Sequence, residues 1–263
     1  ARRAHPALVS FNGMYAYIGG FDGVSSPLAA EAIGKEPLGT MPHALLIVFR
    51  GMRGSHTEGW KAFDKWMPEK VPRIALVDTF FDEVEESLAA AEKIGQEKIW
   101  GVRLDTPSTR RGDFASIISE VRWKLDSHGY ENVKVFCSGG VDETSVRKLN
   151  EAGAEGFGIG GAVAAAPIID YANDITAVKK EGTWTPLAKR SRFDGIKQVW
   201  RVKKDGKYHY KVLMKDKKPN ETQAEPMLQK YIEQGELIKT PPTPDQTRDL
   251  VLRQLPNVDA VPV

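Results

Sequence analysis

Carboxylate residues end two neighbouring apolar segments of this sequence. Asp78 closes a β-prone run that begins at Arg73, and Asp105 closes the next run along the chain. Because the carboxyl ends of parallel strands meet at one edge, we expect both side chains at one catalytic face. Carboxylates there can accept ribose hydroxyls, hold Mg²⁺ or stabilise positive charge developing at a sugar carbon. A lone strand-end aspartate is more often a helix cap. Two such aspartates, with Arg103 beside one of them, favour a functional role instead.

Glycine pairs follow the next two predicted strands, which span 133–137 and 156–159. Glycine lets a phosphate approach the backbone N–H groups at the start of a helix. The alternative is that these glycines only form tight turns, but two such turns in succession favour a phosphate site. The predicted phosphate-binding residues are Ser138, Gly139, Gly140, Gly160 and Gly161.

Cationic and hydroxyl residues near the start of the chain are further candidates for substrate contacts. Arg2 and Arg3 offer forked donors for a carboxylate or pyrophosphate, although such a pair alone is more often ordinary surface charge. His5 follows them closely. Thr40 and His43 come after another predicted strand, and that position makes His43 a candidate catalytic residue.

The elements that would position these residues alternate between strand and helix. Strands are predicted at 73–78, 98–104, 133–137 and 156–159. Two helices are predicted to begin at about Asp82 and Asp113, and a third helix is predicted to span 142–152. Each unit takes roughly 25–35 residues, the length expected of a βαβ crossover. We therefore predict an α/β fold, an incomplete (β/α) barrel of parallel strands. A doubly wound open sheet would produce a similar pattern.

The two ends of the chain are predicted differently. Upstream, strands at 21–25 and 37–40 flank a helix at 28–33, and the apolar run 44–49 could be a strand or a buried helix. Downstream, a hairpin turns at Asp205-Gly206, a helix follows at 225–234, and a proline-rich tail starts at Thr240. We predict a catalytic barrel domain over 1–182 and a small α+β C-terminal domain over 183–263.

Composition excludes several classes of protein. With 37 basic and 35 acidic residues, the net charge of +2 argues against nucleic acid or an acidic membrane as a partner. The single cysteine, Cys137, rules out a disulfide framework or a zinc site built from cysteines, and it fits a reducing compartment. No apolar run approaches the length of about 18–20 residues that spans a membrane. We expect a cytoplasmic protein.

Short motifs along the chain resemble those of one enzyme family. In order they are Arg2–Pro6, Asp22–Ser25, Gly39–Ala44, Val77–Phe80, Arg103–Thr106, Arg111–Asp113, Ser138–Gly140 and Gly158–Gly161. Together they resemble nicotinate phosphoribosyltransferase, especially the archaeal type, in the class that includes the quinolinate and nicotinamide enzymes. The resemblance extends over about residues 1–200.

This resemblance implies a pentosyl transfer in NAD biosynthesis. Nicotinate would react with phosphoribosyl pyrophosphate, with Mg²⁺, to give nicotinate mononucleotide and pyrophosphate. The family pattern places Arg2 near the base and the phosphates, and Arg103 near the pyridine carboxylate or a neighbouring phosphate. Asp78 and Asp105 match positions near the ribose and the metal, so Asp105 is the residue expected to hold Mg²⁺ through the substrate.

The resemblance also implies further residue roles and partners. His43 resembles the histidine that ATP phosphorylates in coupled, ligase-type members. Ser138–Gly140 and Gly160-Gly161 match the cradle of the 5-phosphate. A homodimer or a higher oligomer is expected.

Two departures from the family pattern stand out. Family members carry a further portion before the arginine motif, so we expect this chain to be a truncated form or one subunit of a split enzyme. A separate N-terminal half would then be a partner needed for full activity. Archaeal relatives often hold a cysteine-rich zinc module after the segment that matches Lys197–Arg201, and no cysteine is present there.

Three alternatives remain open from the sequence. A quinolinate phosphoribosyltransferase, which also decarboxylates, has the same fold, although the Thr40–Ala44 motif with its histidine favours the nicotinate enzyme. A barrel aldolase or isomerase would share the phosphate site, but no predicted strand ends in the lysine that a Schiff base requires. A non-catalytic subunit of a split enzyme is the third.

Overall fold

The computed structural model describes residues 4–109, 112–190 and 192–258. The chain forms two compact units. Unit 1 comprises Ala1–Met14 and Gly23–Ala166, and unit 2 comprises Tyr15–Asp22 and Pro167–Val263. The compact units therefore divide after Ala166, whereas the predicted domains divide at 182/183; that division into functional domains stays a prediction.

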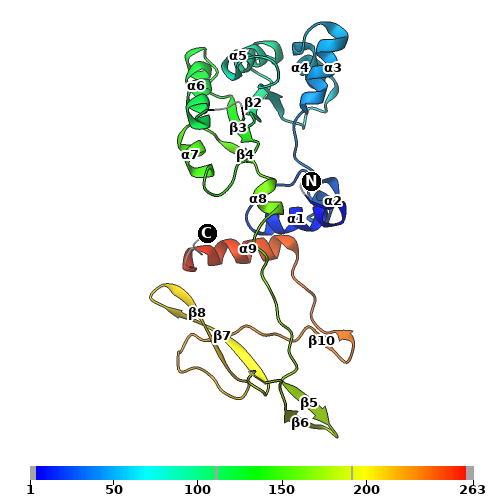
Figure 1. Cartoon of the computed structure of the whole chain (residues 1–263), viewed down its shortest axis with the longest axis vertical. Helices are drawn as coiled ribbons and strands as arrows, with labels where there is room; N and C mark the ends of the chain where they lie inside the picture. Colours follow the sequence, from blue (N-terminus) through cyan, green and yellow to red (C-terminus); the bar gives the residue numbers. More distant parts are fainter. Residues whose placement is uncertain (1–3, 110–111, 191, 259–263) are drawn as a thin grey trace. The chain divides into compact units, whose positions relative to one another are not determined.

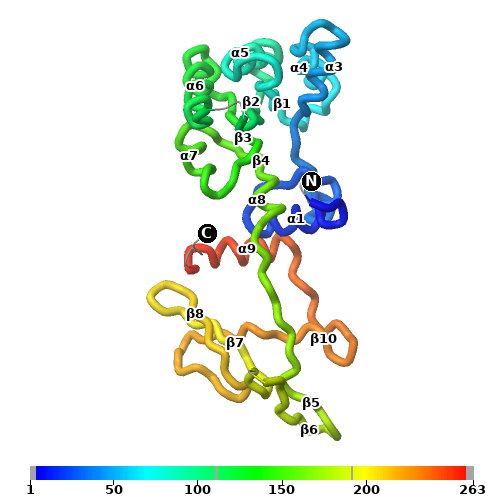
Figure 2. Tube along the Cα trace, in the orientation of Figure 1, coloured from blue at the N-terminus to red at the C-terminus, as the bar shows by residue number. Residues whose placement is uncertain are grey.

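A four-stranded parallel sheet forms the centre of unit 1 (Figures 1 and 2). Its strands lie side by side in chain order: β1 (Arg73–Leu76), β2 (Ile99–Leu104), β3 (Lys134–Ser138) and β4 (Gly156–Gly158). The register pairs Leu76 with Arg103, Arg103 with Phe136, and Phe136 with Gly156. The predicted α/β class and these four strands are confirmed, and within the described residues the sheet is open.

Helices connect consecutive strands of this sheet, and their ends follow the local sequence signals. Three of them are α5 (Glu83–Ile94), α6 (Phe114–Ser127) and α7 (Val146–Glu151). Asp82 accepts backbone N–H bonds at the start of α5, and Asp113 does so for α6, as capping residues do. The apolar stripe of α6 is buried against the sheet at Phe114, Ile118, Val121 and Leu125. The starts predicted for α5 and α6 are confirmed, while α7 is shorter than predicted.

The ambiguous run 44–49 belongs to helix α3 (His43–Arg53), which packs beside α4 (Thr57–Trp66). Leu46 is fully buried, whereas Ile47 and Val48 are exposed, so this apolar run is an amphipathic helix rather than a buried strand. Trp60 of α4 is also fully buried and donates its Nε1–H to the carbonyl of Leu76 at 3.0 Å. That bond joins α4 to β1.

The two strands predicted upstream are wrong. Residues 21–25 and 37–40 are irregular, and between them the Leu38 N–H donates to the Val24 carbonyl at 2.8 Å. A strand pair needs a ladder of backbone bonds, and in the described residues only that one bond joins the two segments to each other. The helix expected between them is present as α2 (Pro27–Ala32), and it is preceded by α1 (Pro6–Ile18), which we did not predict.

The described part of unit 2 contains two two-stranded antiparallel sheets, one three-stranded antiparallel sheet, an α-helix and a short 3₁₀ helix. Its elements are β5 (Ala177–Lys180), β6 (Thr183–Pro186), β7 (Lys197–Lys204), β8 (Lys207–Met214), β9 (Glu225–Pro226), β10 (Ile232–Glu233), β11 (Glu236–Leu237), α9 (Pro244–Gln254) and the short 3₁₀ helix η1 (Leu255–Asn257). The hairpin predicted at Asp205-Gly206 is confirmed, because those two residues join β7 to β8 with positive φ angles.

Two other expectations for unit 2 are corrected. The helix predicted at 225–234 is absent: Pro226 lies in β9, and Gln234-Gly235, both with positive φ, turn β10 into β11. The proline-rich tail contains α9, whose first turn has a capping box between Thr243 and Gln246. Within the described residues, no helix is both long and apolar enough to cross a membrane.

Candidate active site

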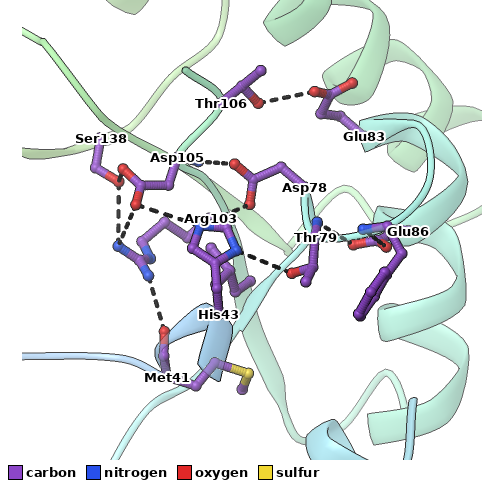
Figure 3. Close-up of polar contacts among 12 residues, drawn as sticks. Met41, His43, Asp78, Thr79, Glu83, Glu86, Arg103, Asp105, Thr106 and Ser138 are labelled. Carbon is purple, nitrogen blue, oxygen red and sulfur yellow. Dashed lines mark hydrogen bonds and ion pairs between the residues drawn. The ribbon is translucent and has the colours of Figure 1, made fainter. Parts of the chain in front are cut away.

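Asp78 and Asp105 meet at the carboxyl ends of β1 and β2 (Figure 3). The backbone N–H of Asp105 donates to Asp78 Oδ2 at 2.8 Å. The side chain of Asp78 is 1% exposed and that of Asp105 is 21% exposed. The structure therefore brings together the two carboxylates that the sequence placed on separate strands, one of them buried and one open to a ligand.

His43, at the start of α3, faces both carboxylates. Its Nε2 lies 3.6 Å from Asp105 Oδ2 and 3.8 Å from Asp78 Oδ1. Its Nδ1 lies 3.2 Å from the hydroxyl of Thr79. The neighbouring Asp105 carboxylate raises the pKa of His43 above its ordinary value, and this effect outweighs the opposing effect of burial.

The two aspartates have different acidities because their surroundings differ. Burial raises the pKa of Asp78 to about 6, and within the described chain its Oδ1 has no hydrogen-bond partner. Burial also opposes the charge on Asp105, but the neighbouring His43 ring and the hydrogen bond from Ser138 keep the pKa of Asp105 below its ordinary value. At neutral pH Asp105 is therefore an anion.

Arg103 and Ser138 complete the cluster from β2 and β3. The Ser138 hydroxyl donates to Asp105 Oδ1 at 2.8 Å, and Arg103 Nη1 donates to the Ser138 hydroxyl oxygen at 3.3 Å. Arg103 Nη2 donates to the carbonyl of Met41 at 2.9 Å. The guanidinium is thus held beside Asp105, with Nη1 at 3.9 Å from Asp105 Oδ2.

The two glycine turns follow strands β3 and β4, beside this cluster. Gly139 has a φ of +84°, and a Cβ at this position would lie 3.0 Å from Asp105 Oδ1. Gly140 also has a positive φ. Gly160 caps the four-residue helix α8 (Gly161–Ala164), which follows β4. Because Ser138 pairs with Gly158, both turns begin at the same edge of the sheet.

Of the other predicted residues, the structure describes Thr40 and His5. Thr40 precedes Met41, and its hydroxyl donates to the Met41 carbonyl at 3.4 Å. His5 lies at the start of the chain, where its Nδ1 accepts the N–H of Ala7. Arg2, Arg3 and Arg111 lie outside the described residues.

Sequence reasoning missed two buried glutamates behind the cluster. Glu86 accepts three backbone N–H bonds from the loop that follows Asp78, and Glu83 accepts the hydroxyl proton of Thr106. Both lie on α5 at apolar-face positions, where a charged residue is unusual. That mismatch in the helical pattern is the signal that could have found them.

A comparison of the sequence with known proteins assigns the chain to a family. Residues 1–173 match the family model described as quinolinate phosphoribosyl transferase, C-terminal domain. The chain belongs to this family. The matched residues of the quinolinate phosphoribosyl transferase domain include both aspartates, His43, Arg103 and the two glycine turns.

Individual relatives agree with the family assignment. A crystal structure of nicotinate-nucleotide pyrophosphorylase from Pyrococcus furiosus superposes with a TM-score of 0.86 at 45% identity, covering 96% of this chain and 63% of that chain. A nicotinate phosphoribosyltransferase of Mycobacterium tuberculosis is 29% identical over 272 residues, covering 100% of this chain and 55% of the relative. Human nicotinic acid phosphoribosyltransferase shows the same fold, with a TM-score of 0.69 at 17% identity over 98% of this chain and 64% of that chain.

These relatives confirm the resemblance read from the motifs, since they carry the name nicotinate phosphoribosyltransferase or a closely related one. The chain spans about half the length of the curated relatives it matches.

Proposed function

We propose that the protein transfers the phosphoribosyl group of phosphoribosyl pyrophosphate to nicotinate, giving nicotinate mononucleotide and pyrophosphate in NAD biosynthesis. The observation that carries this proposal is the meeting of His43, Asp78, Asp105 and Arg103 at one edge of the sheet, beside the glycine turns of β3 and β4. Relatives with the nicotinate enzyme's name support it.

In this reaction the chain's residues position the reactants and stabilise charge. Backbone N–H groups of the turns at Gly139-Gly140 and Gly160-Gly161 bind the 5-phosphate. Asp105, which is ionised and partly exposed, accepts a ribose hydroxyl and stabilises the positive charge that develops at the sugar carbon as pyrophosphate leaves. Arg103 binds the carboxylate of nicotinate or a neighbouring phosphate through its forked donors.

The carboxylates fit a magnesium ion brought in with the substrate. Mg²⁺ prefers oxygen ligands, keeps several waters and is usually held by one or two carboxylates plus substrate phosphates. Asp105 is accessible, and within the described chain Asp78 Oδ1 has no hydrogen-bond partner. Among the described residues no three acidic, histidine or cysteine side chains form a ready-made metal site, so the pyrophosphate would supply the remaining ligands. Bound there, the ion would offset negative charge on the leaving pyrophosphate.

His43 is the residue that we propose for ATP coupling. A ring nitrogen of the neutral imidazole would attack the γ-phosphorus of ATP, ADP would leave, and the phosphohistidine would later be hydrolysed. Because its raised pKa keeps His43 protonated to a higher pH, labelling should increase as the pH rises above neutrality. Incubation with γ-labelled ATP tests this: the intact protein acquires label and His43→Ala does not. Equal labelling of both would exclude His43.

We also propose that the parallel sheet belongs to a (β/α) barrel. Its strands follow chain order without reversal, as barrel strands do, whereas the order of a doubly wound sheet reverses at a switch point. The same proposal assigns catalysis to residues 1–182, in a cytoplasmic enzyme that forms a homodimer or a higher oligomer.

The proposed activity is tested by product formation. The chain is incubated with phosphoribosyl pyrophosphate, Mg²⁺ and labelled nicotinate, alone and together with the N-terminal portion of the Pyrococcus furiosus relative. We expect labelled nicotinate mononucleotide, and loss of the product in Asp105→Asn. Failure to form product under both conditions, together with no calorimetric binding of phosphoribosyl pyrophosphate, would refute the proposal.

A second candidate function is quinolinate phosphoribosyl transfer, because the matching family model is named for that enzyme. A quinolinate phosphoribosyltransferase would release CO₂ as it forms the same mononucleotide. Replacing labelled nicotinate with carboxyl-labelled quinolinate separates the two, since released CO₂ identifies the quinolinate enzyme.

A further inference from the structure

We propose that the first turn of α5 sets the spacing between Asp78 and Asp105 through two buried glutamates, Glu83 and Glu86, which act as positioning residues. Each glutamate holds the loop that carries one of the two aspartates (Figure 3). This inference rests on the proposed function for its catalytic consequence, but the geometry that it describes can be tested without any activity.

Glu86 holds the loop after β1. Its side chain is 1% exposed, and its carboxylate accepts the backbone N–H groups of Thr79 at 3.0 Å, Phe80 at 2.9 Å and Phe81 at 3.0 Å. Asp78 immediately precedes these three residues in the loop, and the Thr79 hydroxyl lies 3.2 Å from His43 Nδ1. Three hydrogen bonds to the Glu86 carboxylate therefore hold the positions of Asp78 and of Thr79, whose hydroxyl contacts His43.

Glu83 holds the loop after β2. It is 5% exposed, and its Oε1 accepts the hydroxyl proton of Thr106, a fully buried residue next to Asp105, at 2.9 Å. Residues three apart on a helix lie on the same side of it, so one turn of α5 reaches both loops. A hydrogen bond from the Asp105 N–H to Asp78 Oδ2 joins the two loops directly.

Packing alone does not account for two acidic residues at these positions. A buried carboxylate is costly unless hydrogen bonds satisfy it, and an apolar residue would fill the same space without that cost. The N-terminal turn of a helix favours negatively charged side chains at these positions. A carboxylate can accept several N–H or O–H donors at once, and this is what anchoring an irregular loop requires.

The test uses matched substitutions on one helical turn. Glu86→Gln preserves size, but its amide nitrogen cannot accept a hydrogen bond, so at least one of the three loop bonds is lost. Glu85→Gln changes an exposed glutamate next to it and serves as the control. Within the described residues the Glu83 side chain accepts one hydroxyl, that of Thr106, so Glu83→Gln can keep that bond through its carbonyl oxygen, whereas Glu83→Leu cannot.

In the nucleotide-forming assay we expect Glu86→Gln and Glu83→Leu to lower kcat by on the order of tenfold or more, because small displacements of reacting groups have large effects. KM for nicotinate should stay within about twofold, since neither glutamate is placed at the base. Glu85→Gln and the conservative Glu83→Gln should stay close to the unchanged protein in both constants. If all four variants show the same fall in kcat and in KM, the positioning role of the two glutamates is contradicted.

An activity-independent measurement separates this inference from the proposed function. The ring ¹⁵N signals of His43 and the exchange rates of the Thr79–Phe81 amides are followed by NMR. In Glu86→Gln the His43 signals should shift and the loop amides should exchange faster, and Glu85→Gln should change neither. If these changes occur while no form of the protein makes nucleotide, the proposed function fails and the positioning role stands.

Unchanged His43 signals and amide exchange in folded Glu86→Gln would overturn the inference. If Glu86→Gln does not fold, the Glu83→Leu and Glu83→Gln pair decides through the carboxyl ¹³C signal of Asp105. A shift in the leucine variant only supports positioning, and the same signal in both variants refutes it.

Discussion

Asp78 is a buried acid whose Oδ2 accepts the Asp105 N–H, while within the described residues its Oδ1 has no hydrogen-bond partner. Burial raises its pKa to about 6, so the folded protein binds this proton more tightly than the unfolded chain does. The stabilisation from that proton is fully present below pH ~4 and is lost as the pH rises through ~6. An acid with this behaviour is retained at the expense of stability at neutral pH, which is typical of functional sites.

The substitution Asp78→Asn should therefore stabilise the protein above neutrality. The amide keeps an acceptor for the Asp105 N–H but cannot ionise. A difference of about two pKa units predicts a gain of roughly 3 kcal/mol in the free energy of unfolding at pH 8, and no gain at pH 4. Urea denaturation at the two pH values, with a chelator present, measures this. A variant less stable than the unchanged protein at pH 8 would contradict the assigned burial cost.

Gly139 lies where a side chain would contact Asp105, and Gly129 provides a matched comparison. Their φ angles are +84° and +82°, but a Cβ at Gly129 would have nothing within 4 Å. Gly129→Ala should cost only the backbone strain, about 1–2 kcal/mol. Gly139→Ala should cost more and should also weaken binding of phosphoribosyl pyrophosphate, because Asp105 must move. Denaturation and calorimetry on both variants measure the difference, and equal losses in the two would exclude the Asp105 contact as a cause.

At the scale of single elements, hydrogen bonds at helix and strand ends determine how the sheet is assembled. Arg73, the first residue of β1, is 8% exposed, and its guanidinium donates to Asp64 Oδ1 and to the carbonyls of Asp64, Met67, Pro68 and Val71. Carbonyl groups at the end of a helix have no intrahelical donor. Arg73 thus satisfies the end of α4 and the turn after it, and directs the chain into β1.

The substitution Arg73→Lys should destabilise unit 1 despite keeping the charge. One ammonium group cannot satisfy acceptors that the planar guanidinium reaches in several directions. Leaving two or more of them unpaired should cost about 3 kcal/mol or more. Lys98→Ala is the control, since Lys98 also contacts Asp64 but is 63% exposed, and loss of such a pair costs at most about 1 kcal/mol. Thermal and urea denaturation should separate the two variants.

At the scale of the whole chain, unit 2 joins segments that are far apart in sequence. Arg248 of α9 donates through Nη1 to the carbonyls of Tyr17 and Phe21, which lie 231 and 227 positions away. The same guanidinium lies 4.7 Å from the centroid of the Tyr17 ring, and the Tyr17 hydroxyl donates to Asp245. Residues 15–22 therefore belong to the compact unit of the C-terminal segment.

The substitution Arg248→Ala should release residues 15–22 from α9. Two carbonyls lose a charged donor and the ring contact disappears, so the amides of Gly19–Phe21 should exchange faster with solvent, by about 10-fold or more. Arg253→Ala, at an exposed position on the same helix, should leave these amides unchanged. Hydrogen exchange read by mass spectrometry or NMR measures both. Unaltered exchange in Arg248→Ala would show that other contacts hold the segment.

Much of the local structure was predictable because its causes are local. The capping residues Asp82 and Asp113 and the turn at Asp205-Gly206 are present where the sequence indicated. Helix α9 could have been predicted as well, since its capping box is a local signal between Thr243 and Gln246. The segment 225–234 has a helix-like pattern, but its pairing with other backbone decides the outcome, and that pairing is not encoded locally.

By itself, the sequence determined the alternation of strands and helices and placed Asp78, Asp105 and the glycine turns at strand ends, since periodicity and caps act over a few residues. Only the tertiary structure decided that His43 lies between the two aspartates and that Glu83 and Glu86 hold their loops. Those contacts join residues on different elements. The burial and the hydrogen bonds that give the two aspartates different pKa values also come from several elements. Such interactions exist only once the elements have packed.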